Sequence, residues 1–224
     1  MALSTIRHDE IFKAHEHNDP IHLIGAGAIG SRVWTALVEL GLTNLTVYDF
    51  DKVEAHNLAN QIYGHDDVGL YKVQALNDWT QFKLGNVPNT FNLVPKKVTK
   101  DSPFELQHTV ILAVDTVAAR KELIEMCVEH NVYHVFDTRM ASTHGNIIYV
   151  NPNNPIAVEK YINELPDEAL AETSACGTSL TVGTTATLIA NLAVWQLMHQ
   201  RSEPAAHDKS IEIYFKPLCL STGG

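Results

Sequence analysis

A glycine-rich turn near the start of the chain is the first feature that could do chemistry. Gly25, Gly27 and Gly30 form a Gly-x-Gly-x-x-Gly pattern directly after a short apolar run. Small residues let a backbone approach a phosphate or ribose, and the N-terminus of a following helix offers unpaired N–H donors and partial positive charge. Asp49 ends the next apolar run, where a carboxylate can accept hydrogen bonds from ribose hydroxyls. The pattern predicts a nucleotide site; a tight strand-to-helix turn without a ligand is the structural alternative.

The residues after Asp49 help to decide between ATP and NAD. The stretch holds a second acid, amides and a lysine, namely Asp51, Asn57, Asn60, Gln61 and Lys72. Amides can donate to phosphate oxygens, and a lysine can neutralise the charge that builds on a leaving pyrophosphate. A dehydrogenase needs no such set beyond its ribose-binding acid, so the stretch favours a triphosphate. The chain has no GxxxxGK[ST] motif, so ATP would not be held as in P-loop proteins.

Two further residues are candidates for chemistry. Asp115 follows the apolar run 109–114, at the edge of the sheet where α/β proteins place ligands, and could hold Mg²⁺. Its structural alternative is the N-cap of the helix expected from Val117. Cys176 lies in a polar loop just before a long helix, and a helix N-terminus favours the thiolate. It is a candidate nucleophile, or a small packing residue in a Ser-Ala-Cys-Gly turn.

Apolar runs and helical spacings alternate along the chain and indicate an α/β fold. Strands are expected at 21–24, 45–48, 90–94, 109–114, 132–136, 145–150 and 212–215, the last as an edge strand. Helices are expected before Gly41 and at 68–84, 117–130 and 178–200, with a loop or crossover over 151–175. This alternation predicts a mostly parallel, Rossmann-like sheet with helices on both faces. No composition break marks a linker, so 1–224 is expected to be one domain.

Composition and charge disfavour several other classes of protein. The chain has 224 residues, with 26 acidic against 16 basic side chains and a net charge of −10. Diffuse binding to nucleic acid or to anionic membranes is therefore not expected. The cysteines Cys127, Cys176 and Cys219 are far apart and odd in number, which predicts a reducing, cytoplasmic compartment and no zinc site. The uncharged segment 178–198 is interpreted as a buried core helix rather than a membrane span.

The order of these motifs resembles that of the ThiF/MoeB/HesA-type, E1-like adenylating enzymes. The resemblance rests on the Gly25–Gly30 turn, on the segment 49–61 as D-x-D-x-V-E-x-x-N-L-x-x-Q, and on Lys72. It also includes the strand that ends in Asp115, with Arg120 shortly after. The resemblance spans at least residues 20–140. The glycines alone would be unspecific, but the combined order is specific to this family.

The resemblance implies ATP-dependent activation of a carboxylate with release of pyrophosphate. In the family the substrate is usually the C-terminal glycine of a ubiquitin-like or sulfur-carrier protein. By position, Asp49 would bind the ribose, and Asn57, Gln61 and Lys72 would line the phosphates. Asp115 would hold Mg²⁺ and contact the carboxylate. A cysteine in the general region of residue 176 carries the acyl group in relatives that transfer it, and a homodimer is expected because relatives are commonly dimers.

Two departures from the family pattern raise questions. The family usually has arginine just before the glutamine, where this chain has Asn60, and an amide supplies neither a permanent charge nor a bidentate fork. Arg139, Arg32 and Arg7 are the candidates to replace it, the last from a partner subunit. The paired CxxC motifs of many members are missing, so no zinc is expected and the C-terminal third should be short and atypical.

Two alternative functions stay open from the sequence. An NAD-dependent oxidoreductase could use the same glycine turn, but the chain shows no Tyr-x-x-x-Lys or similar set for hydride transfer. A non-catalytic, partner-binding E1-like subunit is favoured by Asn60. Tight NAD binding without competition from ATP would indicate the first. Partner binding without formation of an adenylate would indicate the second.

Overall fold

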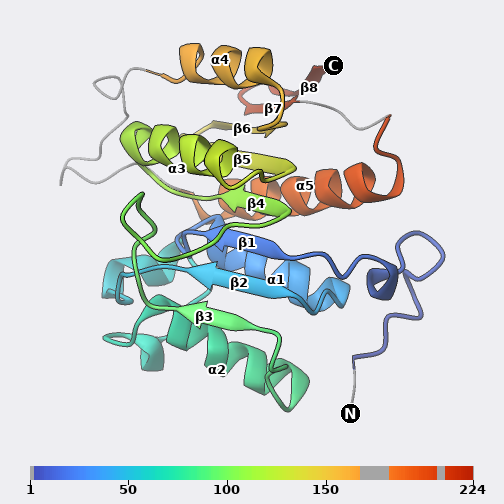
Figure 1. Cartoon of the computed structure of the whole chain (residues 1–224). Helices are drawn as coiled ribbons and strands as arrows, with labels where there is room; N and C mark the ends of the chain where they lie inside the picture. Colours follow the sequence, from blue (N-terminus) through green and yellow to red (C-terminus); the bar gives the residue numbers. More distant parts are fainter. Residues whose placement is uncertain (1–2, 167–181, 206–209, 224) are drawn as a thin grey trace.

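Eight strands form a single sheet in the computed structural model, which describes residues 3–166, 182–205 and 210–223. The strands are β1 (Ile21–Ile24), β2 (Leu45–Tyr48), β3 (Asn92–Val94), β4 (Thr109–Leu112), β5 (His134–Met140), β6 (His144–Val150), β7 (Ser210–Phe215) and β8 (Leu218–Gly223). Their order is β3-β2-β1-β4-β5-β6-β7-β8, which Figure 1 shows from bottom to top. The neighbours from β3 to β5 are parallel, and those from β5 to β8 are antiparallel.

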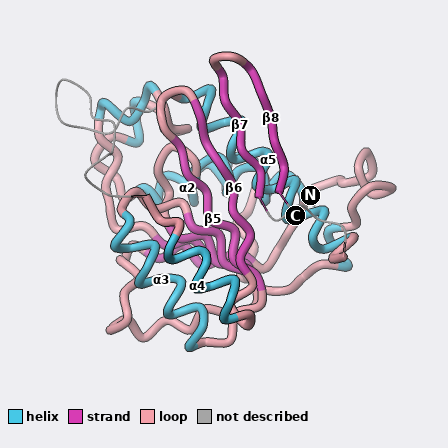
Figure 2. The backbone as a smooth tube through the Cα atoms, turned by 90° about the horizontal axis from the view of Figure 1, so that it is seen from above, coloured by secondary structure: helices cyan, strands magenta, loops and turns pink. Residues whose placement is uncertain are grey.

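Helices cover both faces of the sheet. They are α1 (Gly30–Leu40), α2 (Lys72–Leu84), α3 (Val117–Glu129), α4 (Pro155–Asn163) and α5 (Gly183–Ser202). Helices α1, α2 and α5 pack into one apolar cluster, which includes Trp34, Leu76 and Ile189. Helices α3 and α4 contribute to a second cluster with Ile124 and Tyr161, and Figure 2 shows these two helices side by side. The predicted α/β fold, with a mostly parallel sheet between two helical layers, is confirmed.

The central strands meet at the same level at one edge of the sheet. All four residues of β1 and of β4 are buried, as is typical of parallel strands that are covered on both faces. Ile24, the last residue of β1, pairs with Tyr48 at the end of β2 and with Leu112 at the end of β4. The segments that follow these three strands therefore start next to one another.

Helix α4 corrects the prediction of a loop or crossover over 151–175 for residues 155–163, and residues 167–175 lie outside the described part of the chain. Asn154 caps this helix, because its side-chain Oδ1 accepts the backbone N–H groups of Ile156 and Ala157 at 3.1 and 3.3 Å. Pro155 occupies the first helical turn, where its missing N–H would have no partner in any case. The proline therefore starts a helix rather than marking a loop. Tyr161 anchors α4 in the core with an exposed fraction of 2%.

Other boundaries also differ from the predictions. Helix α2 begins at Lys72 rather than near residue 68, because Tyr71 is extended and forms an antiparallel bridge with Lys52. The segment before it contains two short 3-10 helices, η2 (Ala55–Ala59) and η3 (His65–Asp67). Strand β7 was predicted to be the edge of the sheet. This prediction is wrong, because β8 pairs with β7 along its whole length.

Helix α5 starts within the uncharged segment near the C-terminus. Its described residues begin at Gly183, and residues 178–181 of the expected helix lie outside the described part of the chain. Ala186, Ile189 and Ala193 are fully buried, as expected of a core helix. No helix among the described residues is both long and apolar enough to cross a membrane.

Candidate active site

The glycine turn joins β1 to α1 and packs closely against β4. Gly25 has a φ of 100°, and a Cβ atom on it would lie 2.4 Å from the carbonyl oxygen of Ala113. A Cβ on Gly30 would lie 1.9 Å from the carbonyl oxygen of Gly25. At Gly27, in contrast, an added Cβ would meet no atom within 4 Å. Gly25 and Gly30 are therefore needed for the turn itself, whereas Gly27 leaves space in which a ligand can approach the backbone.

Asp49 holds the glycine turn from the end of β2. Its Oδ2 accepts the backbone N–H of Ala26 at 2.6 Å, and its Oδ1 accepts that of Asp51 at 2.8 Å. Burial raises the pKa of Asp49, although Lys72 and these two N–H groups favour its charged form. A carboxylate offers about four acceptor positions, so Asp49 keeps acceptor capacity for ribose hydroxyls.

Tyr63 is a residue of this site that the sequence analysis missed. Its hydroxyl donates to the carbonyl oxygen of Ala26 at 2.6 Å, so both polar groups of Ala26 are fixed by side chains. Tyr63 is buried, with 5% of its surface exposed. Its position two residues after Gln61, directly behind the nucleotide segment, was the signal available in the sequence.

Lys72 lies beside the acids of the nucleotide segment. Its Nζ is 2.9 Å from Oδ2 of Asp51, and its backbone N–H donates to the carbonyl oxygen of Asp51, also at 2.9 Å. The lysine side chain is 9% exposed and the aspartate side chain 50% exposed. Burial of the Lys72 side chain and its two contacts with Asp51 fix the position of the ammonium group. The ammonium charge acts on Asp49 and favours the charged form of that carboxylate. The structure thus brings Asp49, Asp51 and Lys72 together.

The amides of the segment lie around the 3-10 helix η2. Oδ1 of Asn57 accepts the backbone N–H of Glu54 at 2.9 Å and so caps this helix. Asn57 is buried, and its amide nitrogen takes no part in that capping pair. The carbonyl oxygen of Asn60 accepts from Nη2 of Arg32 at 3.5 Å. The capping role of Asn57 is structural, so only its amide nitrogen is available for a phosphate.

Asp115 is exposed beyond the end of β4. The alternative role of Asp115 as the N-cap of α3 is wrong. The N-cap is Thr116, whose Oγ1 accepts the N–H of Ala119 at 3.3 Å. Arg120 is buried and donates to the carbonyl oxygen of Val114, the residue before Asp115. Gly25 packs against Ala113, which lies two residues before Asp115. The glycine turn is therefore next to the segment that leads from β4 to Asp115.

The structure separates the three arginines that could replace the family arginine. Nε of Arg139 donates to Oδ2 of Asp137 at 2.6 Å, and its guanidinium lies 5.2 Å from the ring centre of Tyr161. Arg7 is exposed in the segment before β1. Arg32 lies in the first turn of α1, in contact with the backbone of Asn60. Arg32 is thus the one of the three that contacts the nucleotide segment in the described structure.

Some of the buried polar atoms without a described partner lie on the first turn of α1 and on the nucleotide segment. They include Oγ of Ser31, Nε of Arg32 and Oε1 of Gln61. Most buried polar atoms in proteins have a hydrogen-bond partner, so such a group requires an explanation. A polar ligand between the first turn of α1 and the nucleotide segment would explain them. The residues present therefore fit a nucleotide.

The described residues offer a limited set of metal ligands. No three His, Cys, Asp or Glu side chains among them converge on one point. Mg²⁺ is commonly bound by one or two carboxylates together with substrate phosphates, so a lone exposed Asp115 is compatible with it. Cys176 lies outside the described residues. Cys127 is buried in α3, and burial raises the pKa of its thiol to about 12.

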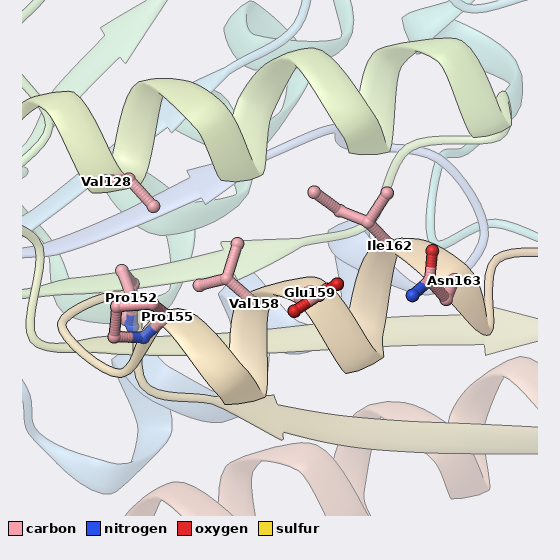
Figure 3. Close-up of a pocket in the computed structure, with 7 residues that line it drawn as sticks. All are labelled: Val128, Pro152, Pro155, Val158, Glu159, Ile162 and Asn163. Carbon is pink, nitrogen blue, oxygen red and sulfur yellow. The ribbon is translucent and has the colours of Figure 1, made fainter.

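A surface groove of about 320 Å³ lies elsewhere, between α3 and α4 (Figure 3). It is lined mainly by apolar and proline side chains, namely Val128, Pro152, Pro155, Val158 and Ile162, with Glu159 and Asn163. No residue of the glycine turn or the nucleotide segment reaches it. The groove lacks the cations and donors that a triphosphate requires, so it is not the candidate nucleotide site.

Comparison with known proteins gives relatives that span most of this chain. Ubiquitin-like modifier-activating enzyme 5 of Drosophila mojavensis is 26% identical over 224 residues, which cover 88% of this chain and 55% of that protein. Adenylyltransferase and sulfurtransferase MOCS3 of Caenorhabditis briggsae is 31% identical over 121 residues, which cover 51% of this chain and 29% of that protein. The chain thus spans about half the length, or less, of these relatives.

A solved structure shares the fold. The crystal structure of E. coli MccB with AMPCPP and MccA superposes with a TM-score of 0.69 at 15% identity, covering 92% of this chain and 64% of that one. The sequence profile of the ThiF family matches residues 2–214, nearly the whole chain. By this match, and with the α/β fold described above, the chain belongs to the ThiF family.

Proposed function

We propose that this protein catalyses the ATP-dependent adenylation of a carboxylate, with the C-terminal glycine of a ubiquitin-like or sulfur-carrier protein as its substrate. One observation carries the proposal. The glycine turn, Asp49 and Asp115 follow three adjacent strands, β1, β2 and β4, whose ends are level in the sheet. Lys72 is fixed beside Asp49 through Asp51. ThiF relatives named as activating enzymes and adenylyltransferases support the same reaction class.

The geometry suggests how the chain's residues would divide the work. Asp49 would accept hydrogen bonds from the ribose, and the N-terminus of α1 beyond Gly27 would face the phosphates. Lys72 and the amides of Asn57 and Gln61 would hold the phosphates in line for attack. Asp115 would hold Mg²⁺, which neutralises phosphate charge when it is bound. The protein contributes alignment and charge neutralisation rather than covalent chemistry.

The proposed reaction is one substitution at phosphorus. A carboxylate oxygen of the substrate attacks the α-phosphorus of ATP and forms an acyl-adenylate. The bond from that phosphorus to the bridging oxygen breaks, and its electron pair leaves with pyrophosphate. In a later step Cys176 would take the acyl group as a thioester and release AMP. A homodimer in the cytoplasm is part of the same proposal.

Pyrophosphate exchange tests the proposal. The full chain, supplied with a small glycine-ending protein that co-purifies with it, should exchange labelled pyrophosphate into ATP. Asp115→Ala should abolish this exchange, because the Mg²⁺ ligand is lost. The matched control is Asp78→Asn, which removes an exposed carboxylate on α2 and should keep full exchange. NAD binding that ATP does not displace would overturn the proposal.

Asn60 favours a second candidate function, a partner-binding subunit without catalysis. The residue has no charge at a position where the family usually carries arginine. Such a subunit would bind the glycine-ending protein but form no adenylate in any mixture. Mass spectrometry for an AMP adduct on the carrier separates the two candidates.

A further inference from the structure

The candidate site contains more negative than positive charge. Asp49, Asp51 and Asp115 are three acids around the glycine turn and the nucleotide segment, and Lys72 is already paired with Asp51 at 2.9 Å. ATP is strongly anionic, so its phosphates need cations beyond this lysine and one Mg²⁺ ion. A further cation in contact with these segments is therefore expected.

Arg32 is placed to supply that charge. It lies in the first turn of α1, the helix whose N-terminus faces the glycine turn. Its Nη2 donates to the carbonyl oxygen of Asn60 at 3.5 Å, and its Nε is buried with no hydrogen-bond partner in the described structure. Burial lowers the pKa of Arg32. Arg32 is thus half-buried with an unused donor, and such a guanidinium gains from an anionic ligand.

The surroundings of Arg32 keep room for its guanidinium. Helix α5 begins at Gly183, where an added Cβ would lie 3.4 Å from Nη2 of Arg32 and 3.2 Å from the carbonyl oxygen of Ala59. The arginine head therefore lies where α1, residues 59–60 and the start of α5 meet. A side chain at position 183 would crowd this junction.

We propose that Arg32 binds the β- and γ-phosphates of ATP and stabilises the leaving pyrophosphate. The inference rests on the proposed function and extends it with a residue from α1 that provides the charge that Asn60 lacks. A guanidinium can form two parallel N–H bonds to a phosphate, which an amide at position 60 cannot.

Nucleotide binding tests this role without a carrier protein. Calorimetry with Mg²⁺ should show that Arg32→Gln weakens ATP binding by about 10- to 100-fold, the effect of losing a charged hydrogen bond. Binding of AMP, which lacks the β- and γ-phosphates, should change by less than about threefold on the same scale. Arg32→Lys should fall between, because it keeps the charge but loses the fork. The control Lys121→Gln removes an exposed cation on α3 and should bind both nucleotides as wild type does.

A double variant separates a phosphate contact from a structural role. Arg32→Gln combined with Asn60→Arg should recover ATP affinity, because it returns a guanidinium to the adjacent segment. Equal ATP affinity in Arg32→Gln and wild type would overturn the inference. Equal losses for ATP and AMP, unrelieved in the double variant, would also overturn it by showing a structural role. If wild type itself fails to bind ATP, the proposed function fails, whatever Arg32 does.

Discussion

Two groups of acidic and basic side chains lie near the ends of the central strands, and they differ in whether their arginines have a carboxylate partner. Asp137 on β5 is fully buried and receives bonds from Arg120, Arg139 and the hydroxyl of Tyr161. The candidate site has an exposed Asp115 and an arginine, Arg32, with an unpartnered donor. Nη2 of Arg139 is also buried without a partner, so the difference lies in the counter-charge: Arg120 and Arg139 are both paired with the carboxylate of Asp137, whereas Arg32 has no carboxylate partner among the described residues.

The pKa values of Arg139 and Arg32 show the same difference between the two groups. Burial opposes the charge of Arg139, but Asp137 and Tyr161 outweigh it and raise its pKa above the usual value. Burial lowers the pKa of Arg32. An arginine that is paired inside the chain stabilises the fold, whereas one that lacks a counter-charge is available to a ligand. We therefore predict a structural role for the Asp137 group and a ligand-binding role for the group that contains Arg32.

The largest expected effect is the loss of Asp137. Asp137→Ala should lower the free energy of unfolding by about 3–5 kcal/mol, because it leaves the guanidinium groups of Arg120 and Arg139, whose side chains are 8% and 13% exposed, without their carboxylate. Urea denaturation followed by circular dichroism measures the change. Asp115→Ala is the matched control, and it should change stability by less than about 0.5 kcal/mol because its side chain is exposed.

Either of two results would break this comparison. A similar loss of stability in both variants would show that Asp115 also has a structural role. A small loss in Asp137→Ala would show that Arg120 and Arg139 find other acceptors, such as the carbonyl oxygens of Val114 and Thr138.

The sequence predicted local features of the fold and site better than pairings across it. The strands at 21–24 and 45–48 were predicted at their observed bounds. Each is a short apolar run that ends at a glycine or an aspartate, so neighbouring residues alone are enough to recognise it. The extra strand β8 was not predicted, because its described residues are mostly exposed and gain their pairing only from β7. Helix α4 had a local signal in Asn154 and Pro155 that was interpreted as a loop.

The three candidate arginines could not be ranked from sequence alone. Residues two apart on a strand share a face, so Asp137 and Arg139 did carry a hint of their ion pair. Nothing local, however, shows that Arg32 contacts Asn60, which is 28 residues away in the chain. Contacts of that kind depend on the packing of α1 against the nucleotide segment.

Two glycines of the same motif offer a second, smaller test. Gly25→Ala should lower the free energy of unfolding by about 2–4 kcal/mol, because it combines a positive φ with a collision against Ala113. Gly27→Ala should cost less than about 0.5 kcal/mol, since nothing lies within 4 Å of the added carbon. Its effect should instead appear in ATP affinity. Thermal unfolding and calorimetry on both variants measure the two quantities, and equal destabilisation would contradict the division between turn and ligand space.

The smallest expected effect concerns an unpartnered atom on β1, ahead of the glycine turn. Nε2 of His22, the second residue of β1, is buried without a partner, while its Nδ1 lies 3.1 Å from the hydroxyl of Tyr48. Burial lowers the pKa of His22 to about 4. The unfolded chain therefore binds the proton more readily, so stability is lost as pH falls from about 6.5 to 4.

Between pH 7 and pH 4 the wild type should lose about 2–3 kcal/mol of unfolding free energy because of His22. The variant His22→Gln should not show this part of the loss. Urea denaturation of both proteins at pH 7 and pH 4 measures it, since the other titrating groups are common to the two. Equal pH dependence would mean that His22 is charged in the fold and has an acceptor. A single unpartnered atom on a buried strand only costs stability, whereas those of Ser31, Arg32 and Gln61 lie on the first turn of α1 and on the nucleotide segment, where a ligand is expected.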